Sequence, residues 1–159
     1  MSKTLIAYFS ASGETARLAN TLASVTGGDL FEIQPQQRYS AADLNWNDRQ
    51  SRSTVEMNDA KSRPAIANRV ENMAQYDVVF VGFPIWWYQA PHIIETFLES
   101  YALSGKRIIP FATSGGSGMG KTAELLKASC SGARVDSGKR LSSSESAASV
   151  QNWVDSLNL

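Results

Sequence analysis

Short apolar runs alternate along the chain with segments whose apolar residues recur every three or four positions. Short, nearly uninterrupted apolar runs are typical of strands that are buried on both faces. They occupy residues 5–9, 30–33, 77–83 and 108–112, and a weaker run surrounds residues 133–135. The run at 77–83 is the most continuous, so we expect it to be the most buried strand.

The segments between these runs have helical spacing. We expect the first helix to begin near Gly13 and to end at Gly27, since glycine often terminates helices. Two more are predicted to begin at Pro64 and Pro91, because proline fits the first helical turn. A fourth passes through residues 125–126, and the last begins at residues 142–145, which have capping-box spacing. The residues expected to face the core are Leu18, Leu22, Val25, Ile66, Val70, Met73, Ile94, Phe97, Leu98, Tyr101, Val150, Trp153, Val154 and Leu157.

Five strands interleaved with helices predict a doubly wound α/β fold. Parallel strands need long crossover connections, which are usually helical and right-handed. The helices are therefore expected on both faces of a five-stranded parallel sheet. A chain of 159 residues with 43% apolar content can form one full core, so we expect residues 1–159 to be a single domain.

Composition argues against several classes of function. Lysine plus arginine and aspartate plus glutamate number 15 each, so no net charge attracts nucleic acid or an anionic membrane. No apolar stretch approaches the roughly 18 residues of a membrane span. Cys130 is the only cysteine, which excludes an internal disulfide, suggests a packed, inert thiol and fits a cytoplasmic location. His92 is the only histidine, and we expect it at the surface or at a helix cap, with no metal cluster or catalytic triad.

Three loops are candidates for a binding site, because open parallel sheets bind ligands outside the carboxyl ends of their strands. The loop after the first strand contains Ser10, Ser12, Gly13, Glu14 and Thr15 and leads into a helix. Free N–H groups and the positive end of the helix dipole suit a phosphate there, and the hydroxyl groups can donate further hydrogen bonds. The alternative is that these hydroxyl groups only cap the helix.

The loops after the third and fourth strands differ sharply in side-chain size. Trp86, Trp87 and Tyr88 follow one another between two prolines, and three neighbouring rings in a loop cannot all face the core. At least one ring is therefore expected at the surface, where it would suit a flat apolar ligand. Residues 113–118 are small, so their backbone can approach the edge of such a ligand.

In order and spacing, these three loops resemble those of the flavodoxin family, and the resemblance covers essentially the whole chain. It implies a flavodoxin-like sheet of strand order 2-1-3-4-5 and FMN as cofactor. The first loop would hold the phosphate, the aromatic loop would flank or cover the isoalloxazine ring, and the third loop would line its polar edge. The implied cofactor-binding residues are Ser10, Ser12, Gly13, Glu14, Thr15, Ala16, Pro84, Ile85, Trp86, Trp87, Tyr88, Thr113, Ser114, Gly115, Gly116 and Gly118. Unlike many flavodoxins, the chain is not acidic and has no aromatic residue in its third loop.

A competing motif overlaps the third loop. Residues 115–122 fit G-x-x-x-x-G-K-T, the phosphate-binding loop of nucleoside triphosphatases. Neither the strand at 77–83 nor the strand at 108–112 ends in an aspartate that could hold magnesium. We therefore expect a glycine-rich turn here, with Lys121 in solvent.

The favoured function is one-electron transfer through FMN, with a reductase and an acceptor of unknown identity as protein partners. An NAD(P)H-dependent FMN or quinone reductase on the same fold is one alternative, and a flavin-free protein-binding module is another. The reductase is mildly disfavoured because no G-x-G-x-x-G fingerprint follows a strand. A monomer or weak dimer is expected.

The polar segment from Gln36 to Arg63 has no clear periodicity. Loops of this length in compact domains are often functional. The segment is expected either to pack beside the flavin or to form a partner or substrate surface, and the sequence leaves these alternatives open.

Overall fold

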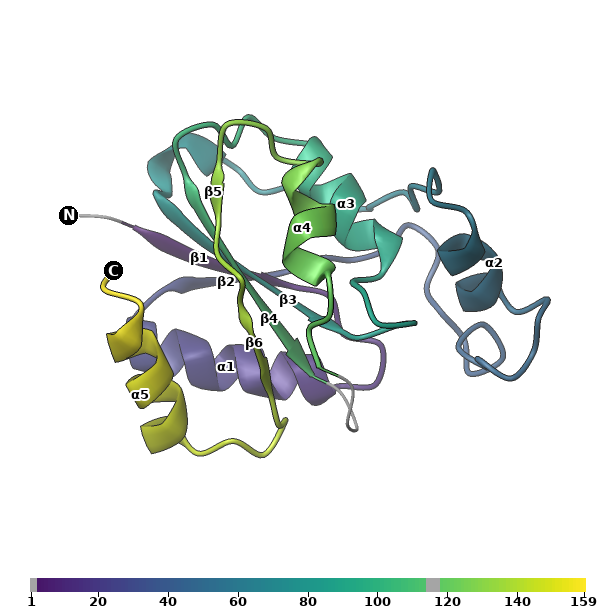
Figure 1. The fold of residues 1–159 in the computed structure, drawn as a ribbon, viewed down its shortest axis with the longest axis horizontal. Coiled ribbons are helices and arrows are strands. Elements are labelled where there is room, and N and C mark those ends of the chain that lie inside the picture. Colours follow the sequence, from purple (N-terminus) through teal and green to yellow (C-terminus); the bar gives the residue numbers. More distant parts are fainter. Residues whose placement is uncertain (1–2, 114–117) are drawn as a thin grey trace.

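The computed structural model describes residues 3–113 and 118–159, which form a parallel sheet with helices on both faces (Figure 1). The strand order is β2-β1-β3-β4-β5, and β6 also pairs with β4. All pairings are parallel, so the predicted flavodoxin-like order is confirmed. The strands are β1 (Thr4–Tyr8), β2 (Asp29–Glu32), β3 (Val78–Pro84), β4 (Arg107–Thr113), β5 (Arg134–Val135) and β6 (Lys139–Leu141).

Helices cover the two faces of the sheet in pairs (Figure 1). Helices α1 (Glu14–Thr26) and α5 (Ala147–Ser156) pack together on one face. Helices α3 (His92–Glu99) and α4 (Thr122–Lys127) lie on the other face. The remaining helix, α2 (Arg52–Asn58), lies beyond the carboxyl ends of the strands together with the rest of the long polar segment.

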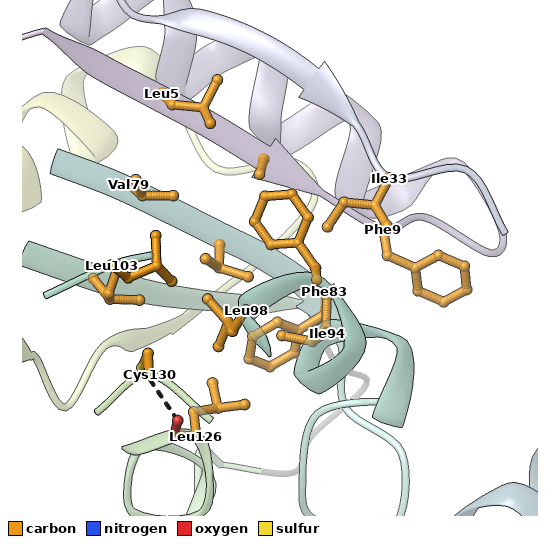
Figure 2. Close-up of a cluster of buried hydrophobic side chains, with 14 of the residues drawn as sticks. Leu5, Phe9, Ile33, Val79, Phe83, Ile94, Leu98, Leu103, Leu126 and Cys130 are labelled. Atoms are coloured by element: carbon orange, nitrogen blue, oxygen red, sulfur yellow. Dashed lines mark hydrogen bonds between the residues drawn. The ribbon is translucent and has the colours of Figure 1, made fainter. Parts of the chain in front are cut away.

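The alternation of side chains along the strands divides the core into two clusters. In β3, Val79, Val81 and Phe83 face α3 and α4, whereas Val78 and Phe80 face α1 and α5. Figure 2 shows the first cluster, in which Phe9 extends beyond the end of β1. Every residue of β3 before Pro84 is buried, as the sequence predicted for this strand.

The edge beside β4 is built from two short strands where the sequence predicted one. β5 pairs with the first half of β4 and β6 with its second half. Pro110 lies between these halves and has no N–H to donate to a neighbouring strand. Gly138 approaches the Pro110 carbonyl so closely that a Cβ would lie 2.4 Å from its oxygen. The edge strand is therefore interrupted opposite Pro110.

The predicted helix beginning at Pro64 is wrong. Only a short 3-10 turn, Met73–Gln75, forms in this region. The backbone instead runs antiparallel to the segment after β2, with Gln36 N–H donating to Ala65 O and Ala67 N–H donating to Gln34 O. Hydrogen bonds between these two segments thus form in place of the helical hydrogen bonds that the apolar spacing predicted.

The last helix begins later than its sequence signal suggests. The expected capping-box contact exists, because the Ser142 N–H donates to the Glu145 carboxylate at 3.1 Å. This contact closes a separate turn, and α5 begins at Ala147 with the Ser146 hydroxyl accepting from Ser149 N–H. Among the described residues, no helix is both long and apolar enough to cross a membrane.

Candidate functional site

The loops after β1 and β4 meet at the carboxyl edge of the sheet through two buried hydroxyl groups. Thr15, in the first turn of α1, and Thr113, the last residue of β4, have their Oγ1 atoms 2.8 Å apart. Both side chains are almost fully buried. This contact fixes the start of α1 relative to the end of β4.

The first loop caps α1 and still leaves hydrogen-bond donors available. The Ser10 Oγ accepts from the N–H groups of Gly13, at 3.0 Å, and Ala16, at 3.2 Å. Gly13 has a φ of 89°, which glycine adopts without strain. No hydrogen bond to another described residue occupies the N–H groups of Glu14 and Thr15. Since the Ser10 hydroxyl hydrogen is also uncommitted, capping is compatible with anion binding at this helix end.

The second loop contains a tight turn that exposes two aromatic side chains. Trp86 and Gln89 exchange both backbone hydrogen bonds, at 2.9 and 3.1 Å. Between them, Trp87 has a φ of 49° and Tyr88 a φ of 64°. Trp87 is 40% exposed and Tyr88 72% exposed, which confirms that at least one ring of this loop lies at the surface.

Backbone strain makes this turn a candidate functional feature. Two-residue hairpin turns with positive φ at both central positions are normally made of glycine, asparagine or aspartate. Bulky residues in this conformation cost about 1–3 kcal/mol each, and such strain is concentrated at functional sites. The strained backbone holds Trp87 and Tyr88 at the edge where ligands of this fold class bind.

The third loop is only partly described. Of its predicted site residues, Ser114, Gly115 and Gly116 lie outside the described residues, while Gly118 is exposed. Further along, Gly120 lies against the aromatic turn, since a Cβ on Gly120 would be 3.1 Å from the Tyr88 carbonyl oxygen. The loops after β3 and β4 are therefore in close contact.

The nucleoside-triphosphatase motif does not form a complete magnesium site in the part that is described. The Thr122 side chain is fully buried, and its hydroxyl donates to the Met119 carbonyl. In a phosphate-binding loop this hydroxyl would contact magnesium. Helix α4 is only six residues long. No cluster of three or more metal-binding side chains occurs among the described residues.

A pocket of about 220 Å³ lies beside the first loop, on its β2 side. Sequence reasoning did not predict it, because its lining combines the end of β1 with the segment that follows β2. The one available signal was Tyr39, one of two aromatic residues in a mostly polar segment. The lining residues are Phe9, Ser10, Ala11, Glu32, Ile33, Gln34, Pro35, Arg38 and Tyr39.

His92 is buried rather than at the surface, so that part of its expected role is wrong. Its Nδ1 lies 2.6 Å from the Ser62 Oγ, which in turn lies 2.8 Å from the Glu56 carbonyl oxygen. The Ser62 hydroxyl has one hydrogen and donates it to this carbonyl, so Nδ1 donates to Ser62. Burial, together with the nearby Arg63 charge, lowers the pKa of His92 below its ordinary value of 6.5. His92 therefore links α3 to the long polar segment.

This lowered pKa predicts loss of stability on acidification. As the pH falls below about 6.5, His92 becomes protonated in the unfolded chain. In the folded protein it becomes protonated only at a lower pH, because its folded pKa is lower. The free energy of unfolding should fall across that window by up to about 1.4 kcal/mol per pH unit. Urea denaturation between pH 7.5 and 5.5 measures the slope. His92→Asn should reduce it, and an equal slope in both proteins would contradict the assignment.

Cys130 is packed, as predicted. Its thiol donates to the Leu126 carbonyl at 3.3 Å within the α3 and α4 side of the core (Figure 2). Burial raises the pKa of this thiol. A buried thiol without a neighbouring base is not a nucleophile.

Comparison with known proteins identifies close structural relatives. A Bacteroides eggerthii protein, provisionally assigned as a flavoprotein, is 49% identical with a TM-score of 0.94 over 100% of this chain and 99% of its own. A Bacteroides uniformis protein with the same provisional assignment is 47% identical, with a TM-score of 0.92 over 97% of this chain and 98% of its own. A flavoprotein from Lactobacillus acidophilus, in complex with FMN, is 25% identical, with a TM-score of 0.72 over 97% and 99% of the two chains.

No curated protein sequence matches the chain. The sequence profile of the flavodoxin family, however, matches residues 3–157, which is nearly the entire length. The parallel sheet, its strand order and the three loops at its carboxyl edge agree with this match. The chain therefore belongs to the flavodoxin family.

Proposed function

We propose that this protein binds one FMN at the carboxyl edge of the sheet and transfers electrons singly between redox partners. The observation that carries this proposal is the strained Trp86–Gln89 turn, which displays two exposed aromatic rings directly after β3, the strand that pairs with β1. Membership of the flavodoxin family and the FMN complex of the Lactobacillus acidophilus relative support the choice of cofactor.

The first loop fits the phosphate group of FMN. The uncommitted N–H groups of Glu14 and Thr15 and the hydroxyl hydrogen of Ser10 offer donors at the positive end of a 13-residue helix. Ser12 and Gly13 are exposed beside them. These groups bind a dianion without a lysine or arginine, because charge-assisted hydrogen bonds and the helix dipole supply the attraction.

The second loop fits a flat ring. Trp87 and Tyr88 offer exposed aromatic surface that can stack on it, with Pro84 and Ile85 leading into the turn. The small third loop, which begins at Thr113, lets backbone groups reach a polar edge. When bound, FMN supplies one-electron oxidation and reduction, and the chain supplies binding, orientation and partial exclusion of water.

This function needs no acid or base from the protein. The only histidine is buried in a hydrogen bond with Ser62, between α3 and the long polar segment. Because the protein has no net charge, its partners, a reductase and an acceptor, must recognise a local surface. The exposed Trp87 and Tyr88 rings are the candidates for that surface.

An absorption spectrum with one equivalent of FMN tests the proposal, followed by stepwise anaerobic reduction with dithionite and, separately, addition of NADPH. We expect bound flavin, reduction in two resolved one-electron steps, and no bleaching by NADPH. Rapid bleaching by NADPH would instead support a reductase. Failure to bind FMN would overturn the proposal and favour a flavin-free binding module.

A further inference from the structure

Tyr39 is held at its hydroxyl and on one face of its ring by the long polar segment that contains it. Its hydroxyl donates to Glu56 Oε1 at 2.5 Å, and the Arg52 guanidinium lies 3.8 Å from its ring centroid. Arg52 Nε also donates to Glu56 Oε2 at 2.9 Å, and its Nη1 donates to the Gln37 carbonyl at 2.6 Å. Arg52 and Glu56 come from α2, so this helix fixes both the hydroxyl and one face of the Tyr39 ring.

The same ring contacts the aromatic turn of the proposed flavin site. The Tyr39 and Trp86 ring centroids are 5.5 Å apart with an interplanar angle of 74°. Phe9 completes the group, 5.5 Å from Tyr39 and 5.8 Å from Trp86. All three contacts are edge-to-face, an arrangement that aromatic rings prefer. Trp86 is thus packed between the end of β1 and the long polar segment.

Trp86 is the residue through which this packing reaches the strained turn. It exchanges both backbone hydrogen bonds with Gln89, and the two residues of positive φ lie between them. A strained conformation persists only where the surroundings determine it from several directions. Trp87 and Tyr88 are exposed, whereas Trp86 is anchored by two other rings. The rings of Tyr39 and Phe9 therefore hold the turn from its first residue.

We propose that Tyr39 is a positioning residue that holds Trp86, and through it the Trp86–Gln89 turn, in the conformation that binds FMN. The segment 36–63 is then a structural part of the cofactor site rather than a partner surface. The inference rests on the proposed function. Arg52 and Glu56 support it, because their side chains, 19% and 15% exposed, are committed to each other and to Tyr39.

Tyr39 keeps the hydroxyl proton that it donates in the anchoring hydrogen bond. Burial, together with the Glu56 carboxylate, raises the pKa of Tyr39 above its ordinary value of 10.0. The phenol therefore remains protonated and donates to Glu56 at neutral pH.

The test compares Tyr39→Leu and Tyr39→Phe with a matched control, Tyr101→Leu. Tyr101 resembles Tyr39 in its contacts: its hydroxyl accepts from Val70 N–H at 2.8 Å, Arg69 lies 4.7 Å from its ring centroid, and Phe97 lies 5.1 Å away. Tyr101 lies in the connection between α3 and β4, and none of these contacts involves the aromatic turn. Both leucine variants should lose similar stability.

Only the Tyr39 variants should change FMN binding. Losing two ring contacts in Tyr39→Leu should weaken binding about tenfold, and losing the hydroxyl in Tyr39→Phe about threefold. Tyr101→Leu should remain within about twofold of the wild type. Without FMN, near-ultraviolet circular dichroism should show a loss of tryptophan signal in Tyr39→Leu but not in Tyr101→Leu.

The outcomes separate the two proposals. If the wild type binds no FMN, the proposed function fails and this inference fails with it. If the wild type binds FMN and the Tyr39 variants bind it equally well, only the inference is overturned. If Tyr39→Leu does not fold, Tyr39→Phe tests the inference through its dissociation constant for FMN and its near-ultraviolet circular dichroism signal from tryptophan.

Discussion

Replacing the two strained aromatic residues together, by Trp87→Asn and Tyr88→Gly, is expected to stabilise the FMN-free protein while weakening FMN binding about a hundredfold. Most substitutions at a binding site lower affinity and leave stability unchanged or reduced. Opposite changes in the two quantities are expected here because the turn combines an unfavourable backbone conformation with the flavin contacts that we propose for its side chains.

The gain in stability comes from the backbone. Asparagine followed by glycine is the preferred pair for a two-residue turn with positive φ at both positions. Relief of strain at Trp87 and Tyr88 is worth about 1–3 kcal/mol each, and the greater freedom of glycine in the unfolded chain offsets about 0.5–1 kcal/mol. Neither side chain belongs to a core cluster, but Trp87 is only 40% exposed, so the loss of its packing offsets a further part of the gain. The net gain should be about 1–3 kcal/mol in urea denaturation.

The loss of binding comes from the side chains. Two aromatic rings that contact a flat ligand contribute about 1–3 kcal/mol beyond the area they bury, and the buried area adds more. Every 1.4 kcal/mol corresponds to a factor of about ten in the dissociation constant. Fluorescence titration of FMN measures this loss.

Trp46 provides the matched control, since it is 71% exposed and lies outside the turn. Trp46→Asn should change neither the free energy of unfolding nor the affinity for FMN by more than about 0.5 kcal/mol. A double variant of the turn that is less stable than the wild type would show that the turn is not strained. A double variant that binds FMN normally would show that its rings do not contact the flavin.

The parts of this structure that could be predicted from the sequence are those determined by local pattern. The doubly wound fold follows from the alternation of strands and helices, whereas the strand order was implied by the resemblance to the flavodoxin family. Crowding of Trp86, Trp87 and Tyr88 in one short loop predicted that at least one ring is exposed. The helix from Gly13 to Gly27 was also predicted almost to the residue, because glycine with positive φ marks both of its ends.

The errors occur where distant segments compete with local preference. Residues 64–73 have helical spacing, yet Ala67 N–H donates to the Gln34 carbonyl and the Ala65 carbonyl accepts from Gln36 N–H. Val70 N–H donates to the Tyr101 hydroxyl. His92 is buried because Ser62, 30 residues earlier in the chain, covers it. The contact between Tyr39 and Trp86 spans 47 positions, and no periodicity in either segment predicts it.

The first loop predicts a large preference for FMN over riboflavin, which lacks the phosphate. The donors at the start of α1 offer several charge-assisted hydrogen bonds, each worth about 1.5–3 kcal/mol. We therefore expect the wild type to bind FMN about a thousandfold more tightly than riboflavin. Parallel titrations with the two flavins measure this ratio, and equal affinities would place the phosphate elsewhere.

Ser10→Ala should reduce this preference about tenfold, because the hydroxyl both donates to the phosphate and holds the N–H groups of Gly13 and Ala16 in place. Removing a helix cap also costs about 1 kcal/mol of stability, so the control must be a variant that loses a helix cap away from the proposed site. Ser146→Ala provides it, since Ser146 caps α5 through Ser149 N–H at 3.1 Å. If both variants lose similar stability but only Ser10→Ala lowers the ratio of the FMN affinity to the riboflavin affinity, the Ser10 hydroxyl acts on the phosphate. If both leave the ratio unchanged, Ser10 serves only as a cap.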